Sequence, residues 1–186
     1  RKEHKDGISR LGGIVLFCGF TITGLLFATT VHYEQANFLI ASSIFLFALG
    51  IKDDIYGVSP STKFALQILV SLILVTLGDF KLSSLYGVFN VWDVHPVAGG
   101  IFSIALIIFI NNAFNLIDGV DGLAGTVGAI VSLCFGVFFA LGNDMAYAFI
   151  AFSMLGSILG FLVFNFPPAK IFMGDTGSLI IGLVSV

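Results

Sequence analysis

Long apolar runs separated by short polar segments dominate the chain. The runs cover residues 13–31, 38–51, 63–78, 99–116, 123–141, 146–164 and 179–186. A helix needs roughly 20 residues, at ~1.5 Å each, to cross a bilayer, and most of these runs approach that length. The pattern therefore predicts an all-α fold, a polytopic transmembrane helix bundle whose polar loops gather at its two ends.

One connecting segment has a different character. Residues 79–97 are rich in β-branched and aromatic side chains, with a turn signal at Tyr86-Gly87 and a break at Pro96. This composition predicts a small β-hairpin or an irregular loop at the membrane surface, with Tyr86 and Trp92 as anchors at headgroup level.

Composition supports a membrane protein and excludes an ordinary soluble one. The chain is 58% hydrophobic and only 10% charged, and its mean hydropathy is +1.07. A soluble core of this size cannot bury so much apolar surface. Cys18 and Cys134 both lie in apolar runs and are interpreted as small core residues, not as a disulfide pair. Because the chain starts at Arg1 and stops at Val186 within an apolar run, we expect one domain over residues 1–186, truncated at both ends.

Basic residues indicate how the chain is threaded. If residues 1–12 are cytoplasmic, all eight Lys and Arg residues except Lys81 fall on the cytoplasmic side, as the positive-inside rule requires. The same threading collects a set of polar side chains at the cytoplasmic end of the bundle: Asp53, Asp54, Asn115, Asp118, Asp121 and Asp175.

The most polar of the motifs follows the apolar run that begins near Gly99. On a helix, Asn111, Asn115, Asp118 and Gly122 share one face, and Asn112 lies beside them. Polar clusters at a membrane boundary are costly, so they usually face a bundle interior or a water-filled cavity. The motif predicts a cation or phosphate site; the alternative is a helix C-terminus with asparagine and glycine stop signals.

A pair of carboxylates, Asp53-Asp54, ends an earlier run. Acids at a helix C-terminus oppose the helix dipole, so the pair should be costly unless a metal or a basic partner compensates. Lys63 is interpreted either as a phosphate partner or as a lysine that extends to the water. The alternative for the pair is a solvated loop.

A Gly- and Pro-rich segment, residues 165–178, precedes the last run. Gly174 and Gly177 allow close backbone approach, and Asp175 or Thr176 could cap the next helix. A glycine-rich turn that opens a helix is also a ready phosphate site, although no Walker motif follows. His4 and Arg10 are expected at the same cavity mouth.

These motifs resemble the polyprenyl-phosphate N-acetylhexosamine-1-phosphate transferases, glycosyltransferase family 4. The matching pieces occur in family order: Arg1-Lys2 with His4, Ser9 to Gly13, Asp53-Asp54 with Lys63, Asn112 to Ala124, and Phe172 to Ser178. Ile117 and Gly57 favour the bacterial undecaprenyl-phosphate N-acetylglucosamine type over the phospho-N-acetylmuramoyl-pentapeptide type, which stays the alternative. A His-rich loop of the family is expected beyond Val186, so the fragment alone is expected to be inactive.

The resemblance implies a Mg²⁺-dependent phosphoglycosyl transferase, with Mn²⁺ as a substitute ion. The phosphate of a polyprenyl lipid would attack the sugar-linked phosphorus of a UDP-N-acetylhexosamine and release UMP, in a first membrane step of cell-envelope glycan synthesis. The implied metal ligands are Asp175 and Asn115. The implied catalytic acids are Asp53, Asp54, Asp118 and Asp121, and the implied substrate-binding residues are Lys63, Asn112, His4 and Arg10.

The expected location is the bacterial inner membrane, crossed many times, with the site facing the cytoplasm. The lipid bilayer and the two substrates are the expected partners; nucleic acid is not, and a homodimer is compatible with the sequence. A cation-coupled transporter is the rival from another class, and a non-catalytic membrane scaffold is a third alternative. The transporter is disfavoured because the acids lie at one end of the spans.

Overall fold

The computed structural model describes residues 9–28 and 35–186, so His4 lies outside the described residues. The described chain is all-α, which confirms the predicted fold class. Its α-helices are α1 (Gly12–Ala28), α2 (Ala36–Tyr56), α3 (Pro60–Thr76), α4 (Pro96–Ile117), α5 (Leu123–Leu141), α6 (Met145–Asn165) and α7 (Gly174–Val184), with a short 3₁₀ helix, η1 (Val88–Asn90).

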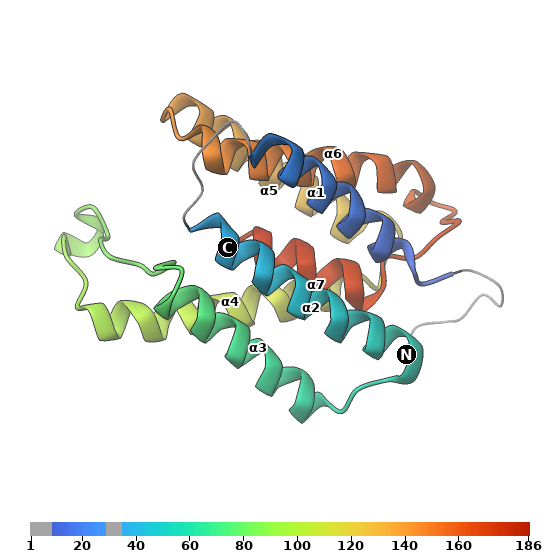
Figure 1. The fold of residues 1–186 in the computed structure, drawn as a ribbon, viewed down its shortest axis with the longest axis horizontal. Coiled ribbons are helices and arrows are strands. Elements are labelled where there is room, and N and C mark those ends of the chain that lie inside the picture. The colour runs from blue at the N-terminus through green and yellow to red at the C-terminus, as the bar shows by residue number, and fades with distance from the viewer. Residues whose placement is uncertain (1–8, 29–34) are drawn as a thin grey trace.

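Helix α7 joins two groups of helices. On one side α1 and α5 pack on α6, and on the other α3 packs on α2 and α4, while α7 contacts α1, α2 and α4 (Figure 1). Thr176, Ser178 and the run Leu179–Ile181 on this helix are fully buried. Helix α7 is therefore the central one among the described helices.

Close backbone contact makes this central position achievable. Gly13 of α1 lies against Gly177, and Gly50 of α2 lies against Thr176. A Cβ atom at either glycine would overlap backbone atoms of α7. Interhelical packing in membranes favours such small residues because they let backbones approach.

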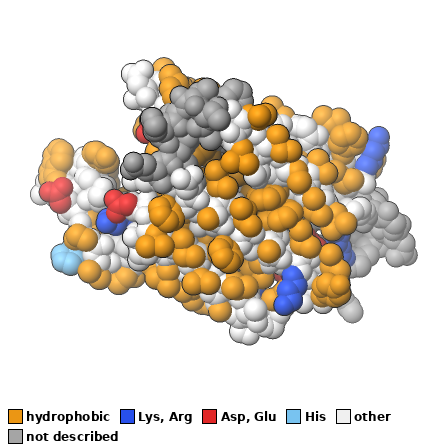
Figure 2. All heavy atoms as spheres, viewed as in Figure 1, with side chains coloured by type: hydrophobic (Ala, Val, Ile, Leu, Met, Phe, Trp, Pro, Cys, Tyr) orange, Lys and Arg blue, Asp and Glu red, His pale blue; other side chains and the backbone are white. Residues whose placement is uncertain are grey.

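Apolar side chains are exposed on the described helices, and Cys18 and Cys134 lie among them on the surface rather than in the core, which corrects the expectation for these two residues. Among the described residues, α4, α5 and α6 are long and apolar enough to cross a membrane, and the shorter apolar helices are α1, α3 and α7. Hydrophobic side chains spread across the face in Figure 2, and the charged ones lie toward the ends of the long axis. We call the end that carries Asp53, Asp54, Asp118 and Asp175 the acidic end.

The segment between α3 and α4 forms a hairpin-like loop and contains no strand in the described residues. Ser84 and Asp93 make a single antiparallel bridge, flanked by hydrogen bonds from Leu85 N to Trp92 O (3.0 Å) and from Val94 N to Ser83 O (2.9 Å). The expected turn is present, since Gly87 has a φ of 85°. The pairing is too short to count as a β-ladder.

Helix α2 continues past its apolar run. The predicted span stopped at residue 51, but the helix ends at Tyr56 and places Asp53 and Asp54 in its last turns. Gly57, with a φ of 74°, then ends the helix. Ser59 caps α3 by accepting from Thr62 N (3.3 Å), and Pro60 opens α3.

The predicted placement of the loops on the two sides of the membrane can be tested directly by labelling. In a background with Cys18 and Cys134 replaced by serine, cysteines introduced at Ser59 and Asn143 should react with an impermeant maleimide from opposite sides of the membrane. The reason is that Ser59 precedes α3 at the acidic end, whereas Asn143 follows α5 at the other end. Labelling of both positions from one side would contradict the threading.

Candidate active site

The carboxylate of Asp54 binds the first turn of α7. Its Oδ1 accepts from Asp175 N at 2.8 Å, and its Oδ2 accepts from Thr176 N at 3.0 Å and from Thr176 Oγ1 at 2.6 Å. Gly174 has a φ of 72°, and a Cβ there would overlap both Asp54 oxygens. A helix N-terminus exposes unpaired N–H groups and positive dipole charge, which a carboxylate satisfies.

This contact corrects two expectations about residues 165–178, the helix cap and the phosphate site. The position preceding α7 is Met173, which makes no side-chain capping hydrogen bond, and neither Asp175 nor Thr176 caps the helix: Asp54 does so from α2. The amides that a phosphate could have used are likewise occupied by Asp54.

Asp53 and Asp175 share one lysine. Nζ of Lys63 lies 2.8 Å from Asp53 Oδ2 and 3.1 Å from Asp175 Oδ2. Asp53 Oδ1 also accepts from Val58 N at 2.7 Å. The Lys63 and Asp53 side chains are only 15% and 11% exposed, so solvent screens their attraction weakly. The costly acid pair at the end of α2 is thus compensated by Lys63 and by the N-terminus of α7.

Asn115 reaches the other oxygen of Asp175. Its Nδ2 donates to Asp175 Oδ1 and to Ser178 Oγ, the latter at 3.1 Å. Three helices therefore meet at one carboxylate: α3 through Lys63, α4 through Asn115, and α7, which carries Asp175.

Asn165, which the sequence did not single out, joins the other two polar loops. Its Oδ1 accepts from Gly122 N and its Nδ2 donates to Ile171 O, both at 2.9 Å. Asp121 Oδ2 accepts from Ala169 N at 3.2 Å beside it. The signal in the sequence is an asparagine at the end of an apolar run, directly before Phe166-Pro167-Pro168, and it also fits the mere start of a loop.

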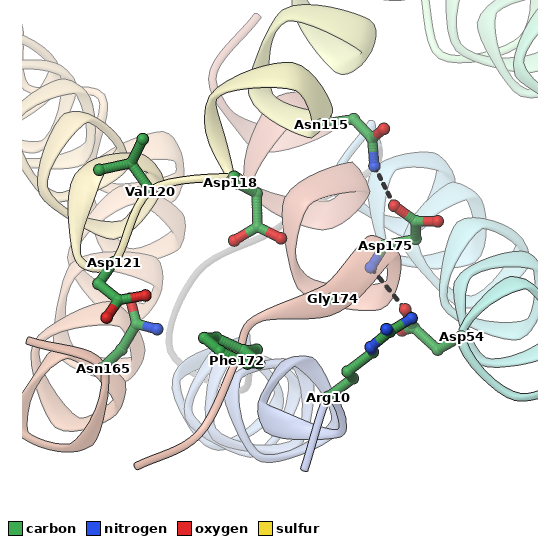
Figure 3. A pocket seen from close by; sticks show the side chains of 11 residues that line it. Arg10, Asp54, Asn115, Asp118, Val120, Asp121, Asn165, Phe172, Gly174 and Asp175 are labelled. Carbon is green, nitrogen blue, oxygen red and sulfur yellow. Dashed lines mark hydrogen bonds between the residues drawn. The ribbon is translucent and has the colours of Figure 1, made fainter. Parts of the chain in front are cut away.

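These loops surround a cavity of about 440 Å³ at the acidic end (Figure 3). Carboxylates line it from three segments, and Arg10 is the basic residue among its lining side chains. The lining residues are Arg10, Asp54, Asn115, Asp118, Gly119, Val120, Asp121, Asn165, Phe172, Gly174 and Asp175. In Figure 3, Asp118 points into the space between Asp121 and Asp175.

The structure thus brings most predicted site residues together. Asp53 and Lys63 do not line the cavity; Lys63 contacts Asp175 from behind the lining, and Asp53 contacts Lys63. Asn112 is also absent from the lining and bonds to Gln67 on α3. The catalytic and binding roles of all these residues stay predictions.

The donor set suits a hard divalent cation. Mg²⁺ prefers oxygen ligands and often takes one or two protein groups, with water and substrate phosphates completing its shell. Asp175 and Asn115 offer such oxygens at the cavity wall. In the part of the chain that the structure describes, no three His, Cys, Asp or Glu side chains are grouped to hold a metal by themselves. The arrangement fits an ion shared with substrate.

Fold and cavity together define an apolar helical membrane protein with an acidic, oxygen-rich site at one end of its bundle. The chain belongs to glycosyl transferase family 4, which matches residues 36–186.

Several curated proteins are similar over almost the whole chain. A probable undecaprenyl-phosphate N-acetylglucosaminyl 1-phosphate transferase of Bacillus subtilis is 34% identical over 98% of this chain and 51% of its own length. A decaprenyl-phosphate N-acetylglucosaminephosphotransferase of Mycolicibacterium smegmatis is 34% identical over 99% and 50%, respectively. A phospho-N-acetylmuramoyl-pentapeptide-transferase of Listeria monocytogenes is 32% identical over 97% and 60%. The chain therefore spans roughly half the length of these relatives.

The contribution of the Asp54 contact to the free energy of unfolding should be measurable. Asp54→Ala removes the acceptor of three hydrogen bonds at the start of α7, so we expect a loss of about 1–2 kcal/mol in the free energy of unfolding. Denaturant or thermal unfolding of the detergent-solubilised protein would measure it. Asp144→Ala is the matched control, since Asp144 precedes α6 without a side-chain cap; equal losses would contradict the capping role.

Proposed function

We propose that the whole protein transfers N-acetylglucosamine 1-phosphate from a UDP-sugar to a polyprenyl phosphate at the cytoplasmic face of a bacterial inner membrane. One observation carries the proposal: the cavity is lined by Asp54, Asp118, Asp121 and Asp175, and it lies where α4 and α6, two helices apolar enough to cross a membrane, reach the acidic end. A water-soluble nucleotide and a membrane-embedded lipid phosphate can meet in such a place. The names of the relatives support the substrate classes.

The reaction joins two anions. An oxygen of the lipid phosphate forms a bond to the sugar-linked phosphorus, the bond from that phosphorus to the bridging oxygen breaks, and UMP leaves. Electrostatic repulsion is the main obstacle, and it is greater in a cavity rich in carboxylates. A bound Mg²⁺, held by Asp175 and Asn115, would supply the neutralising charge.

The other side chains have distinct tasks in this proposal. Lys63 keeps Asp175 ionised and oriented, and Arg10 offers a charge at the cavity wall to a diphosphate. Asp118 and Asp121, on the loop after α4, orient the nucleotide or the ion. Asp54 acts by holding α7 and with it Asp175. A lipid phosphate is largely ionised at neutral pH, so positioning and charge neutralisation can suffice without a general base.

The experiment offers labelled UDP-N-acetylglucosamine to membranes that contain the protein at its natural full length. A lipid-extractable labelled product together with UMP is expected. Labelled UDP-N-acetylmuramoyl-pentapeptide belongs in a parallel reaction, because a relative named for that substrate is 32% identical. Transfer of the muramoyl compound alone would replace the proposed sugar. Absence of both products would leave a scaffold or the cation-coupled transporter, which family membership disfavours.

Asp175→Asn separates a metal ligand from a structural residue. Because Asp54 rather than Asp175 caps α7, and Lys63 keeps its ion pair with Asp53, the substitution should cost little stability, while loss of the charge should lower transfer roughly 100-fold or more. Turnover and its Mg²⁺ dependence would be measured together, and partial recovery at raised Mg²⁺ or Mn²⁺ is expected. Full activity with unchanged metal dependence would show that the ion is held elsewhere.

A further inference from the structure

A pair of side-chain amides, buried Gln67 and half-buried Asn112, links α3 to α4 outside the cavity. Nδ2 of Asn112 donates to Oε1 of Gln67 at 3.0 Å and to its own helix at Ile108 O, at 2.7 Å. Gln67 is 1% exposed. Both hydrogens of the Asn112 amide are therefore engaged, which leaves no N–H on this side chain to bind a substrate.

The Gln67–Asn112 hydrogen bond lies one helical turn from the two residues that bind Asp175. Gln67 lies one turn after Lys63 on α3, and Asn112 lies one turn before Asn115 on α4, so each pair shares a helix face. Lys63 and Asn115 bind the two carboxylate oxygens of Asp175. Helices α3 and α4 are thus linked at two neighbouring levels. At one level both bind Asp175, through Lys63 and Asn115, and at the next Gln67 binds Asn112.

Helix α3 needs such a link because it lies at the edge of the bundle (Figure 1). Its outer face exposes Phe64, Leu69 and Leu72. In lipid, apolar side chains gain little by leaving the hydrocarbon for another helix. Apolar contact alone therefore sets the rotation and the axial register of α3 weakly, whereas a hydrogen bond between two amides is directional.

We infer that Gln67 is a positioning residue: by binding Asn112 it holds Lys63 and Asn115 on the two oxygens of Asp175. The inference rests on the proposed transferase function for its kinetic consequence. Its structural consequence, the fixed placement of the acidic ends of α3 and α4, does not depend on that function.

The kinetic test compares Gln67→Met with Ser71→Ala in the full-length protein. Methionine keeps the length of the side chain but lacks the acceptor, so we expect kcat to fall roughly 10- to 100-fold with little change in KM for the UDP-sugar. Ser71 is the matched control: it is a buried polar residue one turn further along α3, and its Oγ donates to the backbone oxygen of Gln67. Ser71→Ala should turn over at the wild-type rate.

Two further variants distinguish the link from general packing. Asn112→Leu should lower kcat about as much as Gln67→Met, and the double variant should lose no more than either single one, because one shared contact is lost. Gln67→Glu retains an acceptor oxygen and should recover most of the rate. Additive losses in the double variant, or wild-type kcat in Gln67→Met, would overturn the inference.

A spectroscopic readout needs no turnover. Spin labels on cysteines at Phe64 and Leu116, in a background without Cys18 and Cys134, report the distance between the acidic ends of α3 and α4. We expect the distance distribution to broaden in Gln67→Met and to stay narrow in Ser71→Ala. An unchanged distribution in Gln67→Met refutes the positioning role even if the wild type forms no product, whereas missing product alone refutes only the proposed function.

Discussion

The contact between the Asp54 carboxylate and the first turn of α7 is the interaction on which the site depends. It joins the C-terminal end of α2 to the N-terminus of α7, and each of these ends would be electrostatically unfavourable without the other. An acid near the C-terminus of α2 opposes that helix's dipole, and the N-terminus of α7 has unpaired amides. Together they cancel, because Asp54 accepts from Asp175 N and Thr176 N. The same contact fixes where the Asp175 side chain leaves the backbone.

The central position of α7 extends this effect through the bundle. Glycines of α1 and α2 let two helices touch its backbone, and α4 approaches it at Gly182, which lies against Asn111. Asp175 is consequently placed by several neighbours at once, with Lys63 and Asn115 completing its surroundings. Functional groups held by packed helices are located more accurately than groups on free loops. A site built on short loop motifs is in this way supported by the bundle itself.

The lengths of the apolar runs were enough to predict the helical class and most of the helices, and the distribution of basic residues placed the acids at one end. The pairings within that end could not be predicted. Asp54 and Asp175 are far apart in sequence, and neither carries a local sign of the other. Residues Lys52 to Asp54 looked like a helix terminus, since their polarity hides the continuation of α2 to Tyr56. The contacts of Gln67 and Asn165 could not be predicted, because a single polar residue in or after an apolar run carries no pattern that indicates its partner.

The capping contact also constrains how an anionic substrate can be held. A glycine-rich turn that opens a helix would ordinarily attract phosphate, but here a carboxylate already occupies those amides. A diphosphate entering the cavity meets Asp118, Asp121 and Asp175, with Arg10 as the cationic side chain in the lining. Lys63 is held between Asp53 and Asp175, behind that lining. Under the proposed function, binding of an anionic substrate would therefore need added positive charge, and the acids that would repel a bare diphosphate are groups that would attract a divalent cation. Because Asp54 of α2 occupies the N-terminal amides of α7, the charged groups left to line the cavity are mainly carboxylates. Its acidity and a requirement for metal would both follow from this contact.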